Sequence, residues 1–466
     1  MEQTAGTPVA AIVLAAGKGT RMKSPLPKAL HTVCGLPMGE HVGRAMVAAG
    51  ARRPIFVIGH GGDLVRDAFG DKYEYVVQQE QHGTGDACKM ALPAIKNFEG
   101  VVLVGSGDAP LVTGDSMCAL VAEFETSGAD CVVATCILDD PLGYGRMVRD
   151  DKGHVTAIVE EVDASEEQRK VREINAAFYC FSSKALTELL PKLKNDNQKR
   201  EYYLTDLVSI ISSQGGKVAT HVYRDADMLR GVNDRWQLAE AGRLMQQRIL
   251  KTHALAGVTL EDPMTTYIGA DVTVEPDAEI AAMTAIEGAT RIGARCKIGS
   301  FCRIADSDIG ADSVILMSHV NKASVGGGTR VGPYANLRPG TVLGPQVKVG
   351  NFVEIKNSEI GEGASMSHLT YVGDSRVGPR ANIGAGTITC NYDGFAKHET
   401  IIGEDAFVGS NSTLVAPVEI GPGAITAAGS VITQDVPADS LGVGRSRQEN
   451  KEGWAKIWRR KKKNQE

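Results

Sequence analysis

Several familiar sequence signals are missing from this chain of 466 residues. Its nine cysteines form no CxxC pair and show no metal-ligand spacing, so neither a disulfide framework nor a structural zinc site is expected. The net charge is only −6, from 50 basic and 56 acidic residues, and gives no basic field that favours nucleic acid or a membrane. Neither an export signal nor an apolar run of membrane-spanning length is apparent. These absences predict a soluble protein of the reducing cytoplasm, with no nucleic-acid or membrane partner.

The two common phosphate-binding patterns are also missing, although the stretch LAAGKGTRM at 14–22 is rich in residues that bind phosphate. The P-loop requires a glycine five positions before its Gly-Lys pair, where Ile12 stands, and a Ser or Thr where Gly19 stands. The dinucleotide fingerprint fails at Met22, where its third glycine belongs. The stretch must therefore bind its anion, if any, by another pattern.

The length predicts two or three domains. From Val9 to about Arg224, β-rich runs alternate with segments of helical period, which indicates a Rossmann-like α/β domain with a mainly parallel sheet. The β-rich runs are AAIVLAAG, PIFVIGH, YEYVVQQ, GVVLVGSGD, ADCVVATCIL, AAFYCFSS and KVATHVYR. A long amphipathic pattern without proline then predicts a linker helix. We divide the chain into an α/β domain at 1–233, the linker helix at 234–254 and a third region at 255–466.

In the third region, fourteen aliphatic residues are each followed by glycine, and most steps between them are six or twelve residues. They are Ile292, Ile298, Ile309, Val325, Val331, Leu343, Val349, Ile360, Val372, Val377, Ile383, Ile402, Val408 and Ile420. A period of six is too short for helical repeats and predicts a left-handed parallel β-helix of hexapeptide repeats. The aliphatic residue would fill the prism, and the small residue after it would permit the corner. The long step from Ile383 to Ile402 contains TCNYDGFAKHE, which predicts a loop that projects from a coil.

The last sixteen residues are basic. Their cations are Lys451, Lys456, Arg459, Arg460, Lys461, Lys462 and Lys463, grouped around Trp454 and Trp458. We interpret this segment as a solvated tail.

Candidate phosphate ligands follow the first β-rich run, and an open α/β sheet binds ligands beyond the carboxyl ends of its strands. Gly17 and Gly19 would let backbone N–H groups approach an anion. Arg21 and Lys28 supply two cations for a polyphosphate.

A candidate metal ligand ends the run VVLVGSGD, because Asp108 falls at the same edge of the predicted sheet. Mg²⁺ is held by one or two protein oxygens together with substrate phosphates, so one carboxylate suffices. Asn233 could be a second ligand, and QQEQHGTGDA, at 78–87, offers amides for reading a base edge.

The motifs LAAGKGTRM, PLPK, QHGTG, GDAPL, GYGR, IVEE, EIN, EYYLTD and GVN closely resemble those of the sugar-1-phosphate nucleotidyltransferases. With the hexapeptide half, the chain resembles the family of bifunctional N-acetylglucosamine-1-phosphate uridylyltransferases and glucosamine-1-phosphate acetyltransferases. The resemblance implies an enzyme of UDP-N-acetylglucosamine synthesis, serving peptidoglycan and lipopolysaccharide. It implies in-line attack on the α-phosphorus of UTP, with Mg²⁺ on Asp108 and Asn233 and charge stabilisation by Arg21 and Lys28.

The same resemblance implies the residues that bind UTP and the sugar nucleotide. They are Leu14, Ala15, Ala16, Gly17, Lys28, Gln78, Gly83, Thr84, Ser106, Gly107, Asp108, Gly145, Glu160, Asn175 and Asn233. Within this set Gln78, Gly83 and Thr84 would read uridine. The chain departs from the family pattern at Ser106, where many members have Tyr, at Asp86, where many have His, and at Arg200, where Gly is frequent.

His368 in SMSHLTYVG is the candidate general base of acetyl transfer, and a carboxylate such as Glu354 could orient its imidazole. The resemblance implies that glucosamine-1-phosphate is bound by Arg338, Glu354, Lys356, Tyr371 and Asn382. It implies acetyl-CoA contacts at Ala385, Asn391, Tyr392, Ser410, Ala428 and Arg445, and a homotrimer formed through the β-helix.

Two other functions are compatible with the same two halves. A pyrophosphorylase could use its β-helix only to oligomerise or regulate, as in ADP-glucose synthesis; His368 and the CNYDG loop argue against this. A scaffold resembling nucleotide-exchange subunits of translation initiation would not need the intact Arg21, Lys28 and Asp108.

Overall fold

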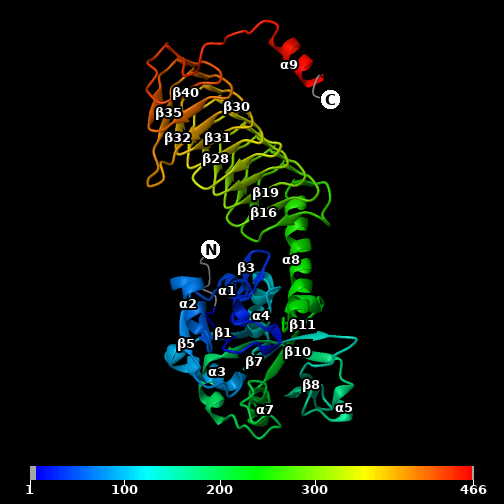
Figure 1. Ribbon diagram of the computed structural model, residues 1–466. Coiled ribbons are helices and arrows are strands. Elements are labelled where there is room, and N and C mark those ends of the chain that lie inside the picture. The colour runs from blue at the N-terminus through cyan, green and yellow to red at the C-terminus, as the bar shows by residue number, and fades with distance from the viewer. Residues whose placement is uncertain (1–6, 464–466) are drawn as a thin grey trace, which may run out of the picture. The chain divides into compact units, whose positions relative to one another are not determined.

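The computed structural model describes residues 7–463 and divides into two compact units, Met1–Arg248 and Ile249–Glu466 (Figure 1). The division falls within helix α8 (Arg235–Leu255), which occupies the segment predicted as the linker. Among the described residues, no helix combines the length and apolar character needed to cross a membrane.

The first unit is built on a nine-stranded sheet in which the path β11-β7-β10-β6-β1-β4-β5 carries a side hairpin, β8-β9. The strands of this unit are β1 (Val9–Ala15), β2 (Thr32–Val33), β3 (Leu36–Pro37), β4 (Ile55–Ile58), β5 (Glu74–Val77), β6 (Val101–Ser106), β7 (Cys131–Ile137), β8 (Arg146–Arg149), β9 (Val155–Val159), β10 (Glu173–Ser182) and β11 (Val218–Tyr223). The pairs β1-β4, β1-β6, β4-β5 and β7-β11 are parallel, whereas β10 runs antiparallel between β6 and β7. All seven predicted runs form strands, and the mainly parallel sheet is confirmed.

Helices cover both faces of this sheet. They are α1 (Met38–Ala48), α2 (Gly62–Phe69), α3 (Thr84–Ala91), α4 (Gly114–Ser127), α5 (Glu166–Arg169), α6 (Ser183–Leu189) and α7 (Asp206–Ser213), with 3₁₀ turns η1 (Thr20–Met22), η2 (Lys28–Leu30), η3 (Gly70–Lys72), η4 (Leu92–Ile95), η5 (Leu190–Lys192) and η6 (Ala226–Leu229). Side chains alternate along β1, so Ala11 and Val13 join the core under α1 and α4, and Ile12 joins the core under α3, α6 and α7. The apolar runs are therefore buried on both faces, as expected for a covered parallel sheet.

The second unit is a prism of three parallel sheets, which is the predicted β-helix (Figure 1). One sheet contains β12 (Thr259–Leu260), β15 (Glu279–Ile280), β18 (Lys297–Ile298), β21 (Val314–Ile315), β24 (Arg330–Val331), β27 (Lys348–Asn351), β30 (Ser365–His368), β33 (Asn382–Ile383), β36 (Phe407–Val408), β39 (Ile425–Thr426) and β41 (Leu441–Gly442). The next contains β13 (Tyr267–Ile268), β16 (Ala285–Glu287), β19 (Arg303–Ala305), β22 (His319–Asn321), β25 (Asn336–Leu337), β28 (Glu354–Lys356), β31 (Tyr371–Gly373), β34 (Ile388–Cys390), β37 (Thr413–Val415) and β40 (Val431–Ile432). The third contains β14 (Thr273–Val274), β17 (Arg291–Ile292), β20 (Asp308–Ile309), β23 (Ser324–Val325), β26 (Val342–Leu343), β29 (Glu359–Ile360), β32 (Ser375–Val377), β35 (Thr400–Ile402) and β38 (Val418–Ile420).

All fourteen predicted aliphatic residues are buried in the core of this prism. The reason for the glycine that follows each of them differs from the expectation. A Cβ on Gly361 would lie 2.5 Å from the backbone nitrogen of Pro379, and one on Gly384 equally close to that of Ser410. The positive φ of the corner is instead adopted two residues after the glycine, as at Arg380 (φ 58°). At positions such as Gly361 and Gly384, glycine is therefore needed because the next coil's backbone approaches closely, not because the corner requires its conformational freedom. Gly332 is an exception, because its own φ is 98°.

The predicted loop interrupts the regular coil. Arg376 pairs with Glu359 of the preceding coil, 17 residues away, but with Ile401 of the following coil, 25 residues away. The extra residues lie between β34 and β35 and are tied by Asp393, whose carboxylate accepts hydrogen bonds from two backbone N–H groups and from His398. These hydrogen bonds lower the pKa of Asp393.

The basic segment predicted as a solvated tail ends in helix α9 (Trp454–Lys463). None of its residues is buried, and the rings of Trp454 and Trp458 stack with centroids 6.4 Å apart.

Two candidate active sites

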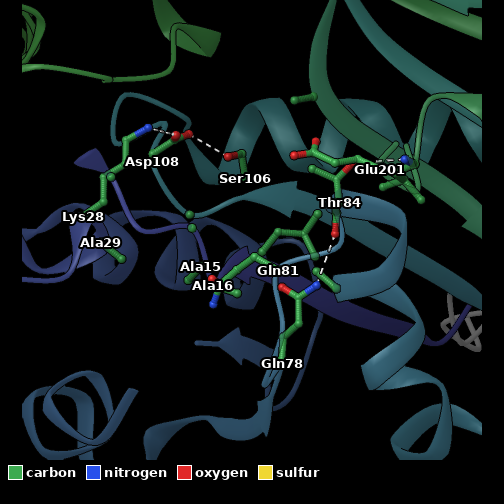
Figure 2. Close-up of a pocket in the computed structure, with 18 of the residues that line it drawn as sticks. Ala15, Ala16, Lys28, Ala29, Gln78, Gln81, Thr84, Ser106, Asp108 and Glu201 are labelled. Carbon is green, nitrogen blue, oxygen red and sulfur yellow. Dashed lines mark hydrogen bonds and ion pairs between the residues drawn. The ribbon is translucent and has the colours of Figure 1, made fainter. Parts of the chain in front are cut away.

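A pocket of about 450 Å³ opens beyond the carboxyl ends of β1, β5 and β6 in the first unit (Figure 2). Parallel pairing brings these ends together, with Leu14 opposite Ser106. Fourteen of the predicted nucleotide and sugar residues line the pocket: Leu14, Ala15, Ala16, Gly17, Arg21, Lys28, Gln78, Gly83, Thr84, Ser106, Gly107, Asp108, Glu160 and Asn175. Gly145 and Asn233 do not line it, although both contact residues that do.

The cations and the candidate metal ligands meet at one end of this pocket. Lys28 Nζ forms an ion pair with Asp108 and donates a hydrogen bond of 2.9 Å to Asn233 Oδ1. Arg21 donates to the same oxygen at 2.8 Å. Figure 2 shows Lys28 and Asp108 pointing toward each other, with Ser106 on the other side of Asp108. One carboxylate and one amide oxygen therefore already surround a single positive charge.

Gly19 is required where the loop after β1, which carries the predicted phosphate ligands and is here called the phosphate loop, folds back on η2. Its φ is 58°, and a Cβ there would lie 2.9 Å from Cβ of Lys28. A side chain at Gly19 would displace Lys28 from Asp108 and Asn233.

The end of the pocket that contains Glu160 and Asn175, which we expect to bind the sugar, has a half-buried carboxyl group. Thr205 donates to Glu160 Oε1 at 3.2 Å, and burial raises the pKa of Glu160. Asn175 donates to the hydroxyl of Tyr179 at 2.7 Å and receives the backbone N–H of Ala177 at 3.0 Å. The amide of Asn175 is therefore fixed, while the second carboxylate oxygen of Glu160 could accept a further hydrogen bond.

Gly19 also lines the pocket, and so does Gln81, one of the amides of the stretch 78–87. Sequence analysis assigned no role to the remaining lining residues: Thr20, Ala29, Ala87, Ala177, Tyr179, Glu201, Leu204 and Thr205. Glu201, Leu204 and Thr205 belong to EYYLTD, which the motif comparison named without assigning residues. Tyr179 gave no signal, because it lies within a strand whose β-bulge between Asn175 and Tyr179 changes which side chains face the pocket.

The three departures from the family pattern have local explanations. Ser106 donates to Asp108 Oδ1 at 2.6 Å, and Asp86 accepts from Gln78 Nε2 at 2.7 Å. Arg200 has φ 54°, a conformation that glycine adopts without cost, which explains the frequent glycine at this position.

The second candidate site lies on the surface of the β-helix. His368 ends β30 and is exposed, and its Nδ1 lies 2.7 Å from Asn351 Oδ1 on the neighbouring coil. Within the chain Asn351, not Glu354, contacts this imidazole. Glu354 lies on another sheet of the prism, in β28, and accepts a hydrogen bond of 2.7 Å from Arg338. Asn351 was missed because its pairing with His368 depends on the coil register.

A group of cations lies beside Tyr371 and Glu354, which are adjacent in register. Lys397, in the looped-out segment, lowers the pKa of Lys356 through a hydrogen bond and through its charge. Asp374 faces both lysines and accepts hydrogen bonds from Asn357 and Asn391. Lys397 was not predicted, and it adds a third cation to Arg338 and Lys356.

The predicted acetyl-CoA residues stack on consecutive coils. The carbonyl of Ala385 accepts from Asn411 N–H at 2.7 Å, and that of Ser410 accepts from Gly429 N–H at 2.8 Å, beside Ala428. Arg445 lies near Gly429, since a Cβ there would be 3.7 Å from Arg445 Cδ. Tyr392 is exposed in the loop that contains Asn391, whereas Asn382 lies in β33, one coil beyond His368 in the same sheet.

A sheet whose edge carries the predicted phosphate ligands, followed by a prism of hexapeptide coils, defines the class: a nucleotidyltransferase joined to a hexapeptide-repeat transferase. Residues 11–203 match the MobA-like NTP transferase domain, and residues 399–434 match the bacterial transferase hexapeptide (six repeats). The chain is 51% identical over 444 residues to the bifunctional protein GlmU of Heliobacterium modesticaldum, a match covering 95% of this chain and 97% of that protein. It is 47% identical to the GlmU protein of Streptococcus thermophilus (96% and 97% covered) and 46% identical to that of Geobacillus thermodenitrificans (97% and 99%).

These likenesses span nearly the whole chain, and the chain belongs to the bifunctional GlmU family. The family predicted from the sequence motifs is confirmed, and with it a bifunctional transferase of UDP-N-acetylglucosamine synthesis. The pyrophosphorylase and scaffold alternatives are set aside, because full-length relatives are named as bifunctional proteins.

Proposed function

We propose that the second unit acetylates glucosamine-1-phosphate and that the first unit transfers the uridylyl group of UTP to the N-acetylglucosamine-1-phosphate so formed. The observation that carries this assignment is the meeting of Lys28, Asp108 and Asn233 beside the phosphate loop. In the first reaction the amine forms an amide bond with the acetyl carbon, and CoA leaves as its thiol. In the second, an oxygen of the sugar phosphate attacks the α-phosphorus of UTP, and pyrophosphate leaves.

We propose Mg²⁺ as the metal of the first site, held by Asp108 and Asn233. The fit rests on chemistry: an acidic and an amide oxygen already accept from one cationic group, Lys28 Nζ, and hard oxygens are the ligands that Mg²⁺ prefers. Among the described residues no cluster of three or more His, Cys, Asp or Glu side chains is present, which fits a metal completed by substrate phosphates. Bound there, Mg²⁺ would neutralise charge on the phosphate oxygens. Arg21 and Lys28 bind the triphosphate and stabilise the charge that passes to the leaving pyrophosphate.

His368 is the proposed general base of acetyl transfer. An amide oxygen can only accept, so the contact with Asn351 Oδ1 places a hydrogen on Nδ1 of the imidazole. The Nε2 lone pair is then available to take a proton from the attacking amine, and the proton passes to the departing thiolate. Asn351 thus has the orienting role that sequence analysis had given to Glu354.

The phosphate of glucosamine-1-phosphate is assigned to Arg338, Lys356 and Lys397. Lys397 lowers the pKa of Lys356, and a bound anion would offset this repulsion between neighbouring cations, which supports a phosphate subsite here. Glu354, Tyr371 and Asn382 complete the proposed substrate contacts, and the stacked corner formed by Ala385, Ser410 and Ala428 is the proposed path of acetyl-CoA, with Asn391, Tyr392 and Arg445.

We assign the trimer interface to an apolar ridge along one corner of the prism. The ridge consists of one exposed residue from each of six coils: Met283, Phe301, Met317, Tyr334, Phe352 and Leu369. The rings of Tyr334 and Phe352 stack with centroids 5.3 Å apart. A continuous apolar line of this length is typical of a surface covered by a second copy of the chain. Leu369 directly follows His368, so assembly would cover the exposed imidazole.

A cytoplasmic location is proposed because all nine cysteines are free. The function is tested by incubating the protein with glucosamine-1-phosphate, acetyl-CoA, UTP and Mg²⁺. UDP-N-acetylglucosamine should appear only when all four are present, and omission of acetyl-CoA should be overcome by N-acetylglucosamine-1-phosphate. Absence of product in both mixtures would contradict the proposal.

A further inference from the structure

Gln78 follows strand β5 and is 3% exposed on the wall of the nucleotide pocket. Its amide nitrogen Nε2 is 2.7 Å from Asp86 Oδ2 and 3.3 Å from the carbonyl oxygen of Gly83. Figure 2 shows the side chain of Gln78 beneath Gln81 and Thr84. Among the described residues, no group donates to the other amide atom, Oε1.

The orientation of this amide follows from its partners. A carboxylate and a backbone carbonyl can only accept, so both hydrogens of Nε2 are used and Oε1 must face the other way. A Gln side chain can otherwise present either a donor or an acceptor by rotating its amide. Asp86 removes that freedom, because a hydrogen bond to a carboxylate is stronger than one to a neutral group.

We infer that Asp86 is a positioning residue that makes the first site specific for uracil over cytosine; the inference rests on the proposed uridylyl transfer. A fixed Oε1 acceptor matches the N3–H donor of uracil. At the same position cytosine has a lone pair, and two acceptors facing each other repel. Asp86, where many family members have His, would thus act by fixing the orientation of the Gln78 amide.

A structural role for Asp86 must be separated from this one, since Asp86 also lies in the first turn of α3, where a carboxylate stabilises the helix. Asp115 has the same place in the first turn of α4 and provides a matched control. The readouts are kcat and KM with UTP and with CTP, together with equilibrium binding of the two nucleotides in the presence of Mg²⁺.

For Asp86→Ala we expect the preference for UTP over CTP to fall about tenfold, which corresponds to one lost charge-assisted hydrogen bond. KM for UTP should rise while kcat changes little, since the base is remote from the reacting phosphorus. Asp86→Asn should keep part of the preference, because its amide oxygen can still accept from Nε2. Asp115→Ala should leave the preference unchanged. In a Gln78→Ala background, Asp86→Ala should have no further effect on the UTP to CTP ratio.

Equal losses for UTP and CTP in Asp86→Ala would overturn the inference and leave Asp86 a helix-stabilising residue. An unchanged ratio in a variant with wild-type melting temperature would overturn it as well. If the wild-type protein neither binds UTP in preference to CTP nor turns it over, the proposed function and the inference fail together. If the wild-type preference exists and survives Asp86→Ala, only the inference fails.

Discussion

The first site lies within a pocket and the second on a surface, and this difference shows what each needs to be complete. Gln78 is 3% exposed and Asn175 8% exposed, so the first unit by itself excludes most water from its ligand contacts. In the β-helix, the side chains of Arg338 and Glu354 remain 42% and 37% exposed, and His368 is exposed. A β-helix turns its aliphatic side chains inward, so its polar side chains lie on the outer surface. We therefore expect the second site, but not the first, to be completed by a neighbouring copy of the chain.

The pKa values of carboxyl groups are shifted in opposite directions in the two units. In the first unit, burial raises the pKa of Glu160 and raises that of Asp206 to about 6, where Glu160 and Asp163 add to the effect. In the β-helix, hydrogen bonds and charge from Arg295 lower the pKa of Asp312, and Arg380 does the same for Asp405. Burial in the α/β unit desolvates these acids, while the stack of coils places its acids beside arginines of a neighbouring coil.

The largest effect that separates the two sites is expected from Asp108→Ala. Uridylyl transfer should fall by roughly a thousandfold or more, because the metal and its charge stabilisation are worth several kcal/mol. Acetyl transfer should stay near wild type, since no β-helix residue is altered. Pyrophosphate release and CoA thiol release, measured on the same sample, check this. Loss of both activities in a folded variant would contradict the independence of the sites.

His368→Ala should lower the turnover of acetyl transfer by roughly two to four orders of magnitude, the usual worth of positioned proton transfer. Asn351→Ala should lower it by about tenfold, because the imidazole keeps its lone pair but loses its fixed tautomer. Uridylyl transfer from ready-made N-acetylglucosamine-1-phosphate serves as the internal control and should not change. A His368→Ala variant that keeps most of its acetyl transfer would leave the general base to be found elsewhere.

Introducing charges into the apolar ridge should separate the two activities, because we expect only acetyl transfer to depend on assembly. With Tyr334 and Phe352 both changed to Glu, we expect monomers by light scattering and a loss of acetyl transfer of roughly one to two orders of magnitude, because two charges would have to be buried at the interface. Uridylyl transfer should persist. Val342→Glu is the control, an exposed apolar residue of the prism outside the ridge. An oligomer that survives the double change would place the interface elsewhere.

The smallest effect concerns the buried acids. Asp206 has a folded pKa of about 6 against 3.8 for the free group, so the folded state binds the extra proton between these values. Its contribution to stability therefore falls as the pH rises from about 4 to 6, and above that range the ionised group is unfavourable. Asp206→Asn should therefore raise the free energy of unfolding of the first unit by about 1 kcal/mol at pH 8. We keep this figure small because Asp206 is partly exposed and because its charge is favourable at the N-terminus of α7. Below pH 4 the substitution should change the free energy of unfolding little, since Asp206 is protonated there. Urea unfolding at both pH values tests this, and equal effects at the two would contradict it.

Much of the fold could be predicted from the sequence because its signals are local. Each of the fourteen predicted aliphatic residues is buried in the prism, and each predicted β-rich run of the first half forms a strand. The hairpin β8-β9 and the antiparallel direction of β10 escaped prediction, because strand direction depends on how distant segments pair. The role of the repeated glycines was also misjudged, since the close contact at Gly361 comes from a residue of the next coil.

By itself the sequence determined the two-part architecture, many of the residues that line the pocket of the first unit and the identity of the cations around Asp108, since these follow from periodicity and from motifs of fixed spacing. Only the tertiary structure decided which groups act on one another. It placed Asn351 instead of Glu354 against His368, brought Lys397 to Lys356, and set Asp86 against Gln78. The physical reason is that a hydrogen bond depends on a separation of about 3 Å between atoms, and register between coils or between a strand and a helix fixes that separation without leaving a trace in local sequence.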